Sequence, residues 1–281
     1  MNYPSFISIA KKYKAIFFDS YGVVKKYNGL IPNVQSVMDE LRNDGKIIRL
    51  LTNDASRSPQ RQSERFFNQG LKGLIPEEII TSGMMASIFL QQKIKQGKVA
   101  YLGTEKSAYY ISNVGLIPVP MSEVNEDNYQ EISAMVFLDD EGFDWARDIN
   151  KTINLLRKKN IPVIIANTDK IYPVAKKNVN IATGGIAKLV ENILGRKFIH
   201  FGKPDTQMFN YAFNDINKEQ VIKMDEILMV GDTLKTDILG GNKFGISTVL
   251  VLSGNTRIEN VHTKIKSSGI IPNYICDSIT S

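Results

Sequence analysis

The stretch 229–238, MVGDTLKTDI, places two aspartates at the end of one buried strand. Its first residues belong to an apolar run, and Asp232 follows that run directly. Asp237 comes five residues later, about one turn into a following helix. Two carboxylates at this spacing can reach one Mg²⁺, an ion that prefers hard oxygen ligands and water. The alternative is a helix N-cap with an acid in the first turn, a common way for a helix to begin.

Three other stretches end an apolar run in polar residues. They are 17–22 (FFDSYG), 50–53 (LLTN) and 201–205 (FGKPD). Asp19 can act as a nucleophile or cap a loop, and Thr52 can donate to a phosphoryl oxygen or precede a helix. Pro204 suits the first turn of a helix, so we expect Lys203 at a positive helix N-terminus, where it would bind a dianion. Because open α/β sheets bind ligands at the carboxyl edge of their strands, these stretches are candidates for one site.

Short apolar runs alternate with helical patterns along most of the chain. Apolar residues have helical spacing over 33–43, with Gly45 just beyond, and again over 144–159. Several short runs are continuous, as in parallel strands that are covered on both faces. The expected strands are 15–19, 47–52, 79–81, 99–103, 134–138, 163–166, 198–201, 227–230 and 248–252. This alternation predicts an α/β protein of βαβ units.

The middle of the chain carries the best sign of a second unit. The stretch 116–130 is rich in loop-forming residues, including Pro118 and Pro120, and in acids. No long Gly/Ser/Pro linker marks a boundary. We therefore expect a unit inserted in the middle of the chain, within a core that both ends of the chain form.

The composition of the 281 residues excludes several classes of protein. A hydrophobic share of 43% and a charged share of 23% are near the soluble globular average, which excludes disordered and fibrous chains. No apolar stretch approaches the ~18–20 residues of a membrane helix, and the N-terminus lacks the apolar region of a secretory signal. Two histidines leave no room for a His-rich metal cage. The single Cys276 fits a reducing compartment, so we expect a cytoplasmic protein.

The formal net charge of +6 reflects 35 Lys and Arg against 29 Asp and Glu. The basic residues are spread along the chain, and they form no single stripe with interleaved aromatic residues. We interpret them as solvated faces with a general attraction for anionic ligands. Neither a nucleic-acid partner nor a membrane partner is expected.

The order strand–Asp, strand–Thr, Gly-Lys-Pro and Gly-Asp-x4-Asp resembles the four motifs of the haloacid dehalogenase (HAD) superfamily. The stretches 202–204 (GKP), 236–240 (TDILG) and 249–254 (VLVLSG) are similar to the NagD-like, or class IIA, sugar and nucleotide phosphatases. The resemblance implies a doubly wound, Rossmann-like parallel-sheet core with an inserted α/β cap domain of type 2. The expected domains are the first part of the core, the cap and the second part of the core, at 1–82, 83–199 and 200–281.

The resemblance also implies the roles of the motif residues. Asp19 would attack phosphorus and carry an aspartyl-phosphate. The ligands of Mg²⁺ would be Asp19, the backbone carbonyl of Tyr21 and Asp232, with Asp237 ligating the ion or orienting a bound water. Thr52 and Lys203 would bind the transferring oxygens.

The inserted cap is expected to exclude water and to contact the substrate. The stretches 165–169 (IANTD) and 183–186 (TGGI) resemble the cap of the subfamily. The predicted substrate-binding residues are Asn53, Asn167 and Asp169. The expected partner is a small phosphorylated metabolite, of the sugar phosphate or nucleotide class. Because relatives dimerise through the cap, a homodimer through the cap is also expected.

Tyr21 departs from the pattern of the superfamily's phosphatases. These carry an aspartate two residues after the nucleophile, which protonates the leaving group and then activates water. A phenol with an ordinary pKa near 10 is a poor base at neutral pH, and losing general acid–base help costs ~10²–10⁴ in rate. The cap stretch 139–141 (DDE) could supply a substitute acid or form a solvated turn.

Two other functions stay open beside an Mg²⁺-dependent phosphatase. The form Asp-x-Tyr-Gly at 19–22 resembles the haloacid dehalogenases, which use no metal because halide leaves as an anion. Against that function, Asp232 and Asp237 are best explained by a metal, and the insertion follows the second motif rather than the first. The other alternative is a non-catalytic sensor that binds Mg²⁺ and a phosphometabolite but is stalled by Tyr21. The metal argument favours the phosphatase.

Overall fold

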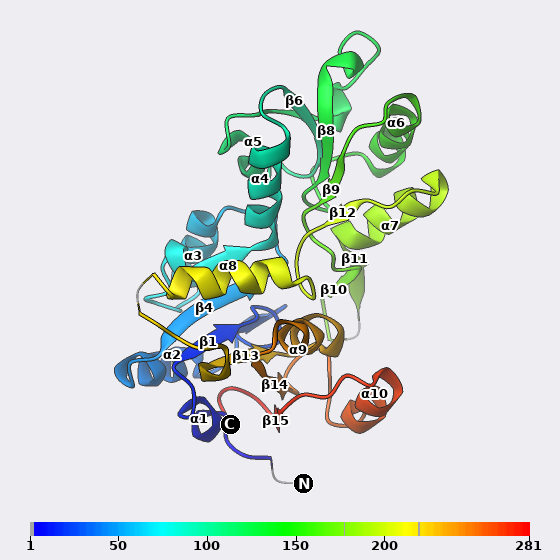
Figure 1. The fold of residues 1–281 in the computed structure, drawn as a ribbon. Coiled ribbons are helices and arrows are strands. Elements are labelled where there is room, and N and C mark those ends of the chain that lie inside the picture. Colours follow the sequence, from blue (N-terminus) through cyan, green and yellow to red (C-terminus); the bar gives the residue numbers. More distant parts are fainter. Residues whose placement is uncertain (1–2, 177, 219) are drawn as a thin grey trace. The chain divides into compact units, whose positions relative to one another are not determined.

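The computed structural model describes residues 3–176, 178–218 and 220–281. The chain forms two units, each with its own parallel sheet (Figure 1). Unit 1 comprises Met1–Thr52, Pro59–Ile80 and Lys203–Ser281, and unit 2 comprises Asn53–Ser58 and Thr81–Gly202. The expected limits at 82/83 and 199/200 therefore differ from the observed ones by two or three residues. The segment Asn53–Ser58, expected in the core, groups with unit 2.

Unit 1 is built on a six-stranded sheet with the order β15-β14-β13-β1-β4-β5. The strands are β1 (Ala15–Phe18), β4 (Ile47–Thr52), β5 (Ile79–Thr81), β13 (Ile227–Gly231), β14 (Ser247–Val251) and β15 (Tyr274–Cys276), and a hairpin of β2 (Lys25–Lys26) and β3 (Gly29–Leu30) follows β1. β1 pairs in parallel with β13 on one side and β4 on the other. Every residue of β1 is buried, which accounts for its continuous apolar sequence.

Helices cover this sheet. They are α1 (Phe6–Ala10), α2 (Val34–Asn43), α3 (Pro59–Asn68), α8 (Thr206–Ile216), α9 (Leu239–Phe244) and α10 (Val261–Ser268), with shorter turns at Pro76–Glu78, Met224–Glu226 and Leu234–Ile238. α8 packs on β4 and α9, and α9 packs on β14, so the two helices share one face of the sheet (Figure 1). α1 and α2 supply Phe6, Met38 and Leu41 to a buried cluster that includes Phe18. The resulting α/β core is doubly wound, as expected.

Unit 2 is built on a second parallel sheet, with the order β12-β9-β8-β6-β7. Its elements are α4 (Ser82–Lys93), β6 (Lys98–Leu102), α5 (Tyr109–Ser112), β7 (Ile117–Pro120), β8 (Ile132–Phe137), α6 (Trp145–Lys158), β9 (Val163–Ile165), α7 (Thr183–Leu194) and β12 (Ile199–His200), with a hairpin of β10 (Ile171–Pro173) and β11 (Val179–Ile181) and short turns at Met121–Glu123 and Tyr129–Glu131. Phe137 of β8, Leu155 of α6 and Val190 of α7 lie in its buried core.

The structure confirms most expected elements and corrects two. The helices predicted over 33–43 and 144–159 are α2 and α6, with Asn33 and Asp144 at their N-cap positions. The stretch 116–130, expected to be loop-rich, contains β7, which tolerates two prolines because it is an edge strand. Pro204 does not lie in a helix: its peptide bond to Lys203 is cis, and α8 begins two residues later, at Thr206.

Membrane insertion through a helix finds no support in the described part of the chain. No helix there combines the length and the hydrophobicity that a bilayer crossing needs.

Candidate active site

The topology of unit 1 places two of the motif aspartates side by side. From β1 the chain builds outward through β4 and β5, then returns to add β13 on the other side of β1. The order of strands therefore reverses between β1 and β13, which is where doubly wound sheets bind ligands. Phe18 is paired with Val230 across these strands, so Asp19 and Asp232 emerge next to each other at the carboxyl edge.

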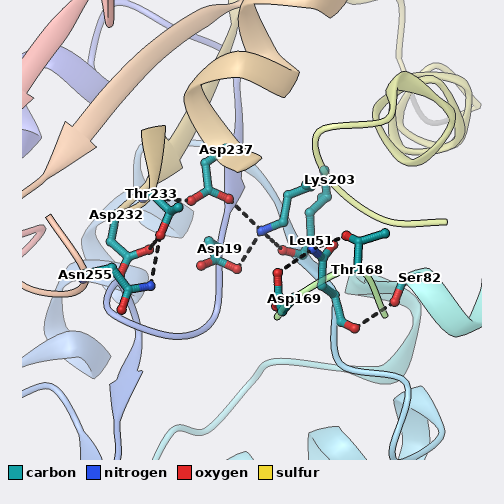
Figure 2. Close-up of polar contacts among 11 residues, drawn as sticks. Asp19, Leu51, Ser82, Thr168, Asp169, Lys203, Asp232, Thr233, Asp237 and Asn255 are labelled. Carbon is teal, nitrogen blue, oxygen red and sulfur yellow. Dashed lines mark hydrogen bonds and ion pairs between the residues drawn. The ribbon is translucent and has the colours of Figure 1, made fainter. Parts of the chain in front are cut away.

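Three carboxylates converge at this edge. Asp19, Asp232 and Asp237 each offer one oxygen, and these oxygens lie within 4.8 Å of one another (Figure 2). Asp232 and Asp237 are buried, at 1% and 0% exposure. Asp237 reaches the edge because Gly231 leaves room for it: a Cβ at Gly231 would lie 2.1 Å from the Asp237 Cβ. The two aspartates of the stretch 229–238 thus serve one cluster.

The Lys203 ammonium lies against three groups of this cluster. Its Nζ lies 2.6 Å from Asp19 Oδ1 and 2.7 Å from Asp237 Oδ1, and it donates to the carbonyl of Leu51 at 2.9 Å. Leu51 precedes Thr52, the last residue of β4, which is also buried. Burial alone would lower the pKa of Lys203, but the two carboxylates raise it, so the ammonium stays charged.

The charges in this cluster do not balance. Among the described residues, the three carboxylates of Asp19, Asp232 and Asp237 lie close together, and the ammonium of Lys203 pairs with two of them, Asp19 and Asp237. Burial raises the pKa of Asp19 well above its usual range, and Asp237 and Asp232 raise it further against the lowering effect of Lys203. Burial, reinforced by Asp237, raises the pKa of Asp232 to about 7. A divalent cation would neutralise the excess negative charge, and an all-oxygen donor set suits Mg²⁺.

Tyr21 is half-buried and turned toward the β2–β3 hairpin. Its phenol is hydrogen-bonded to the backbone of Tyr27, which lies between the two hairpin strands. Burial is the largest cause of a raised pKa at Tyr21; the Tyr27 contact lowers it and the Asp232 carboxylate raises it. The phenol is therefore protonated at neutral pH, as expected from the sequence.

The three predicted substrate-binding residues belong to unit 2, where they form a cluster of their own. The Asn53 side-chain amide donates to Asp169 Oδ1 at 3.0 Å and to Thr168 Oγ1 at 3.3 Å. The Asn53 carbonyl accepts a hydrogen bond from Ser82 Oγ at 2.8 Å. Asn167 Oδ1 accepts from the Asp169 N–H at 2.9 Å, which closes a local turn.

Thr233 and Asn255 contact the Asp232 carboxylate, and sequence reasoning did not select either of them. Thr233 donates to Asp232 Oδ1 at 2.8 Å, and the Asn255 N–H donates to Oδ2 at 2.6 Å (Figure 2). A signal for Asn255 was available, because Ser253-Gly254-Asn255 follows the buried strand β14 at the same edge of the sheet. Carboxylates, an ammonium and a hydroxyl at the switch point of a doubly wound sheet are typical of α/β enzymes that transfer phosphoryl groups.

Comparison with known proteins agrees with this class. The model of the haloacid dehalogenase-like hydrolases matches residues 16–117, and an HAD-hydrolase-like model matches residues 200–281. A crystal structure from Cytophaga hutchinsonii, described as a possible sugar phosphatase of the HAD superfamily, is 51% identical with a TM-score of 0.96 over 100% of this chain and 99% of that one. Human chronophin is 27% identical over 95% of this chain and 90% of its own length.

A further solved structure has the same fold at lower identity. The p-nitrophenyl phosphatase from Archaeoglobus fulgidus is 25% identical, with a TM-score of 0.80 over 95% of this chain and 97% of that one. The chain belongs to the NagD-like, class IIA branch of the haloacid dehalogenase-like hydrolases and is a hydrolase that acts on phosphoric monoesters.

Proposed function

We propose that the protein is an Mg²⁺-dependent phosphatase that forms an aspartyl-phosphate on Asp19. The observation that carries the proposal is the position of the Asp19 carboxylate: it follows β1 at the switch point and is held at 2.6 Å by the Lys203 ammonium. A carboxylate fixed in this way can attack phosphorus without searching for its orientation.

The proposed reaction has two steps. In the first, an oxygen of Asp19 forms a bond to phosphorus while the bond from phosphorus to the ester oxygen breaks, and the leaving alkoxide takes a proton from solvent water. In the second, water attacks the aspartyl-phosphate, which releases inorganic phosphate and regenerates the Asp19 carboxylate. Lys203 and Thr52 bind the transferring oxygens, where a fixed positive charge and fixed donors stabilise the transition state.

Asp19, Asp232 and the carbonyl of Tyr21 would hold Mg²⁺, with Asp237 as a further ligand or as the partner of a bound water. Bound there, the ion supplies charge neutralisation for the transferring phosphoryl group. Support comes from the convergence of three carboxylates, two of them buried, because a cation bound there would offset their mutual repulsion. Asp237 already receives two interactions, from Lys203 and from the Thr233 N–H at 3.1 Å, which favours its indirect role.

The proposed substrate is a small phosphomonoester of the sugar phosphate or nucleotide class. Relatives described as a possible sugar phosphatase and as a glycerol-3-phosphate phosphatase support small polyol esters. Asn53, Asn167 and Asp169 remain the proposed substrate contacts. Their mutual hydrogen bonds would hold Asp169 in one orientation, ready to accept from substrate hydroxyls.

The decisive experiment is a phosphate-release screen over a panel of phosphometabolites, with and without Mg²⁺. We expect Mg²⁺-dependent turnover of at least one sugar phosphate or nucleotide, and its loss in Asp19→Asn. Asp44→Asn, an exposed acid of unit 1, is the matched control. Binding of phosphometabolites without turnover would point to a sensor. Halide release from 2-haloacids in EDTA would point to a dehalogenase-like hydrolase.

We also propose a homodimer that forms through unit 2. Exposed apolar side chains gather on the β10–β11 hairpin and on α7: Ile171, Val179, Ile181, Leu189 and Ile193, each 48–57% exposed. Apolar residues grouped on neighbouring elements are typical of protein contact surfaces. Sedimentation velocity should give a dimer for the native chain and a monomer for Val179→Glu combined with Leu189→Glu. A native monomer at micromolar concentration would contradict the proposal.

A further inference from the structure

The loop at residues 253–256 follows β14, the strand beyond β13, and lies outside the four motif segments. Its main chain and its side chains contact the loops that carry the proposed metal ligands. These contacts all lie within unit 1.

The main chain of this loop encloses the Asp232 carboxylate. The Asn255 N–H donates to Oδ2 at 2.6 Å, and the Thr256 N–H donates to the Asp232 carbonyl at 3.2 Å. Gly254 permits this approach, because a Cβ there would lie 1.9 Å from Asp232 Oδ2. Gly22 approaches the same oxygen from the loop after β1, where a Cβ would lie 2.1 Å away. Two glycines and one N–H therefore confine Oδ2.

The side chain of Asn255 reaches the other carboxylate oxygen through Thr233. Asn255 Nδ2 donates to Thr233 Oγ1 at 3.0 Å, and Thr233 Oγ1 donates to Asp232 Oδ1 at 2.8 Å (Figure 2). A hydroxyl has one hydrogen, and an ionised carboxylate can only accept. The Asn255 amide donates to one lone pair of Thr233 Oγ1. This contact favours the orientation in which the hydroxyl hydrogen of Thr233 points to Asp232.

The same loop also fixes the nucleophile's loop. Ser253 Oγ donates to the carbonyl of Gly22 at 2.5 Å, one residue after the Tyr21 carbonyl. On its far side the loop is tied to α10, because Lys264 Nζ donates to the Asn255 carbonyl at 3.1 Å. A loop anchored at both sides can transmit a fixed orientation to the residues that it contacts.

We propose that the 253–256 loop positions Asp232 for metal binding, and that Asn255 and Thr233 are positioning residues in a two-bond relay to its Oδ1. This inference rests on the proposed Mg²⁺ site. Each Asp232 oxygen receives one of these hydrogen bonds and retains lone-pair capacity for a cation. Partners that orient a metal ligand in this way typically change metal affinity by ~10–100-fold when they are removed.

The test is calorimetric titration of the phosphate-free protein with Mg²⁺, which needs no turnover. Asn255→Ala keeps the backbone N–H bond to Oδ2 but removes the relay, and Thr233→Val removes the hydroxyl at nearly constant volume. We expect each to raise the Mg²⁺ Kd about tenfold or more. Thr233→Ser retains the hydroxyl and should remain within about twofold of the native Kd. Glu259→Gln, an exposed change near the loop, is the matched control and should also leave the Kd unchanged.

Kinetics provides a second readout. Excess Mg²⁺ should restore kcat in Asn255→Ala, with the substrate KM unchanged, because a positioning residue does not touch the substrate. Melting of the metal-free variants checks that the fold is retained. The inference alone is overturned if the native protein binds Mg²⁺ and Asn255→Ala binds it equally well. Absence of Mg²⁺ binding by the native protein would overturn the proposed metal site, and this inference with it.

Discussion

Tyr21 and Asp19 stand two residues apart, yet their side chains meet different surroundings. Asp19 is held by Lys203 at the switch point, whereas the Tyr21 phenol is hydrogen-bonded to the hairpin backbone at Tyr27. Burial raises the pKa of Tyr21 above its ordinary value of 10.0. A proton donor this weak gives little help to an alkoxide leaving group, and its conjugate base is scarcely populated at pH 7.

The first prediction concerns Tyr21→Asp. The native enzyme should favour aryl and acyl phosphates, whose leaving groups need no proton, over alkyl sugar phosphates. Tyr21→Asp should speed alkyl phosphate hydrolysis at least tenfold, or ~1.4 kcal/mol of transition-state stabilisation, and barely change aryl phosphates. The measurement is kcat/KM across a series of leaving-group pKa values. Tyr21→Phe, which removes only the hydroxyl, should show the same dependence of kcat/KM on leaving-group pKa as the native enzyme.

If kcat/KM of the native enzyme did not depend on the pKa of the leaving group, this account would be contradicted and another residue would have to supply the proton. Asp139 is the first residue to test in that case. Burial raises the pKa of Asp139 to about 6, with Asp140 and Asp54 contributing, so its carboxyl is partly protonated near neutral pH. Loss of alkyl phosphate hydrolysis in Asp139→Asn, with aryl phosphates unaffected, would assign the proton to it.

Several site residues could be predicted because each follows a strand that the sequence pattern itself indicates. Asp19 and Asp232 each follow a buried strand, and parallel strands deliver their ends to one edge. The relay from Asn255 to Thr233 could not be predicted, because it depends on which way two side chains of separate loops turn. The Asn167 turn is similar: its Oδ1 is engaged by the Asp169 N–H, a local bond that spacing alone does not specify.

At the scale of elements, one buried carboxylate joins α7 to β12. Glu191 of α7 accepts from the Phe198 N–H at 2.7 Å and contacts His200 Nε2 at 3.0 Å and Lys188 Nζ at 3.2 Å. Burial would raise the pKa of Glu191, but these partners outweigh burial and lower it to about 2. The carboxylate therefore stabilises the end of unit 2 that leads into Lys203.

The second prediction follows from the sign of this shift. A carboxyl whose folded pKa is depressed adds stability above its unfolded pKa, and this stability is lost as pH falls toward the folded value. Glu191→Gln should lower the melting temperature at pH 7, by the equivalent of about 1–3 kcal/mol, and the difference should shrink between pH 4.5 and 2. Glu105→Gln, an exposed acid of unit 2, is the control for thermal melts across this range. A difference in melting temperature between the native protein and Glu191→Gln that does not change with pH would contradict the ion-pair account.

The sequence did not predict β7, because proline is compatible both with a loop and with an edge strand. Pro118 and Pro120 predicted a loop, but β7 is an edge strand, and an edge strand can lack backbone donors on its free side. The following segment is held by α6, whose C-cap residue Lys159 donates to the carbonyls of Tyr129, Gln130 and Ile132. Lys159, which belongs to a basic run, thus holds a loop that precedes it by about thirty residues in the sequence. Sequence spacing does not reveal such a contact.

At the scale of the whole molecule, both units are parallel sheets built from the same kind of strand–helix alternation. That alternation is continuous in the sequence, so it predicts the α/β class but not where one sheet ends and the other begins. The placement of Asn53–Ser58 in unit 2 shows why. This segment is too short to show a sequence pattern of its own. Its assignment to unit 2 reflects hydrogen bonds to residues of that unit, such as the one from Asn53 to Asp169.

The last prediction uses the distribution of the site over unit 1. Its proposed ligands come from segments around residues 19, 52, 203 and 232–237, which are far apart in the sequence and all belong to unit 1. Beryllium fluoride with Mg²⁺ mimics an aspartyl-phosphate and would bridge these segments. Binding to the folded state alone stabilises it by RT ln(1 + [L]/Kd), about 2.7 kcal/mol at a hundredfold excess over Kd.

Thermal melts should therefore show a rise of several degrees with Mg²⁺ and beryllium fluoride together, less with either alone, and none in EDTA. Asp19→Asn should lose the response, because asparagine lacks the carboxylate oxygen that would coordinate beryllium. Asp44→Asn should retain it. Hydrogen exchange should slow mainly at the carboxyl end of β4 and in the loops after β1 and β13. A response that survives in Asp19→Asn, or in EDTA, would place the anion elsewhere, because the proposed complex needs both the carboxylate and the cation that the three aspartates hold.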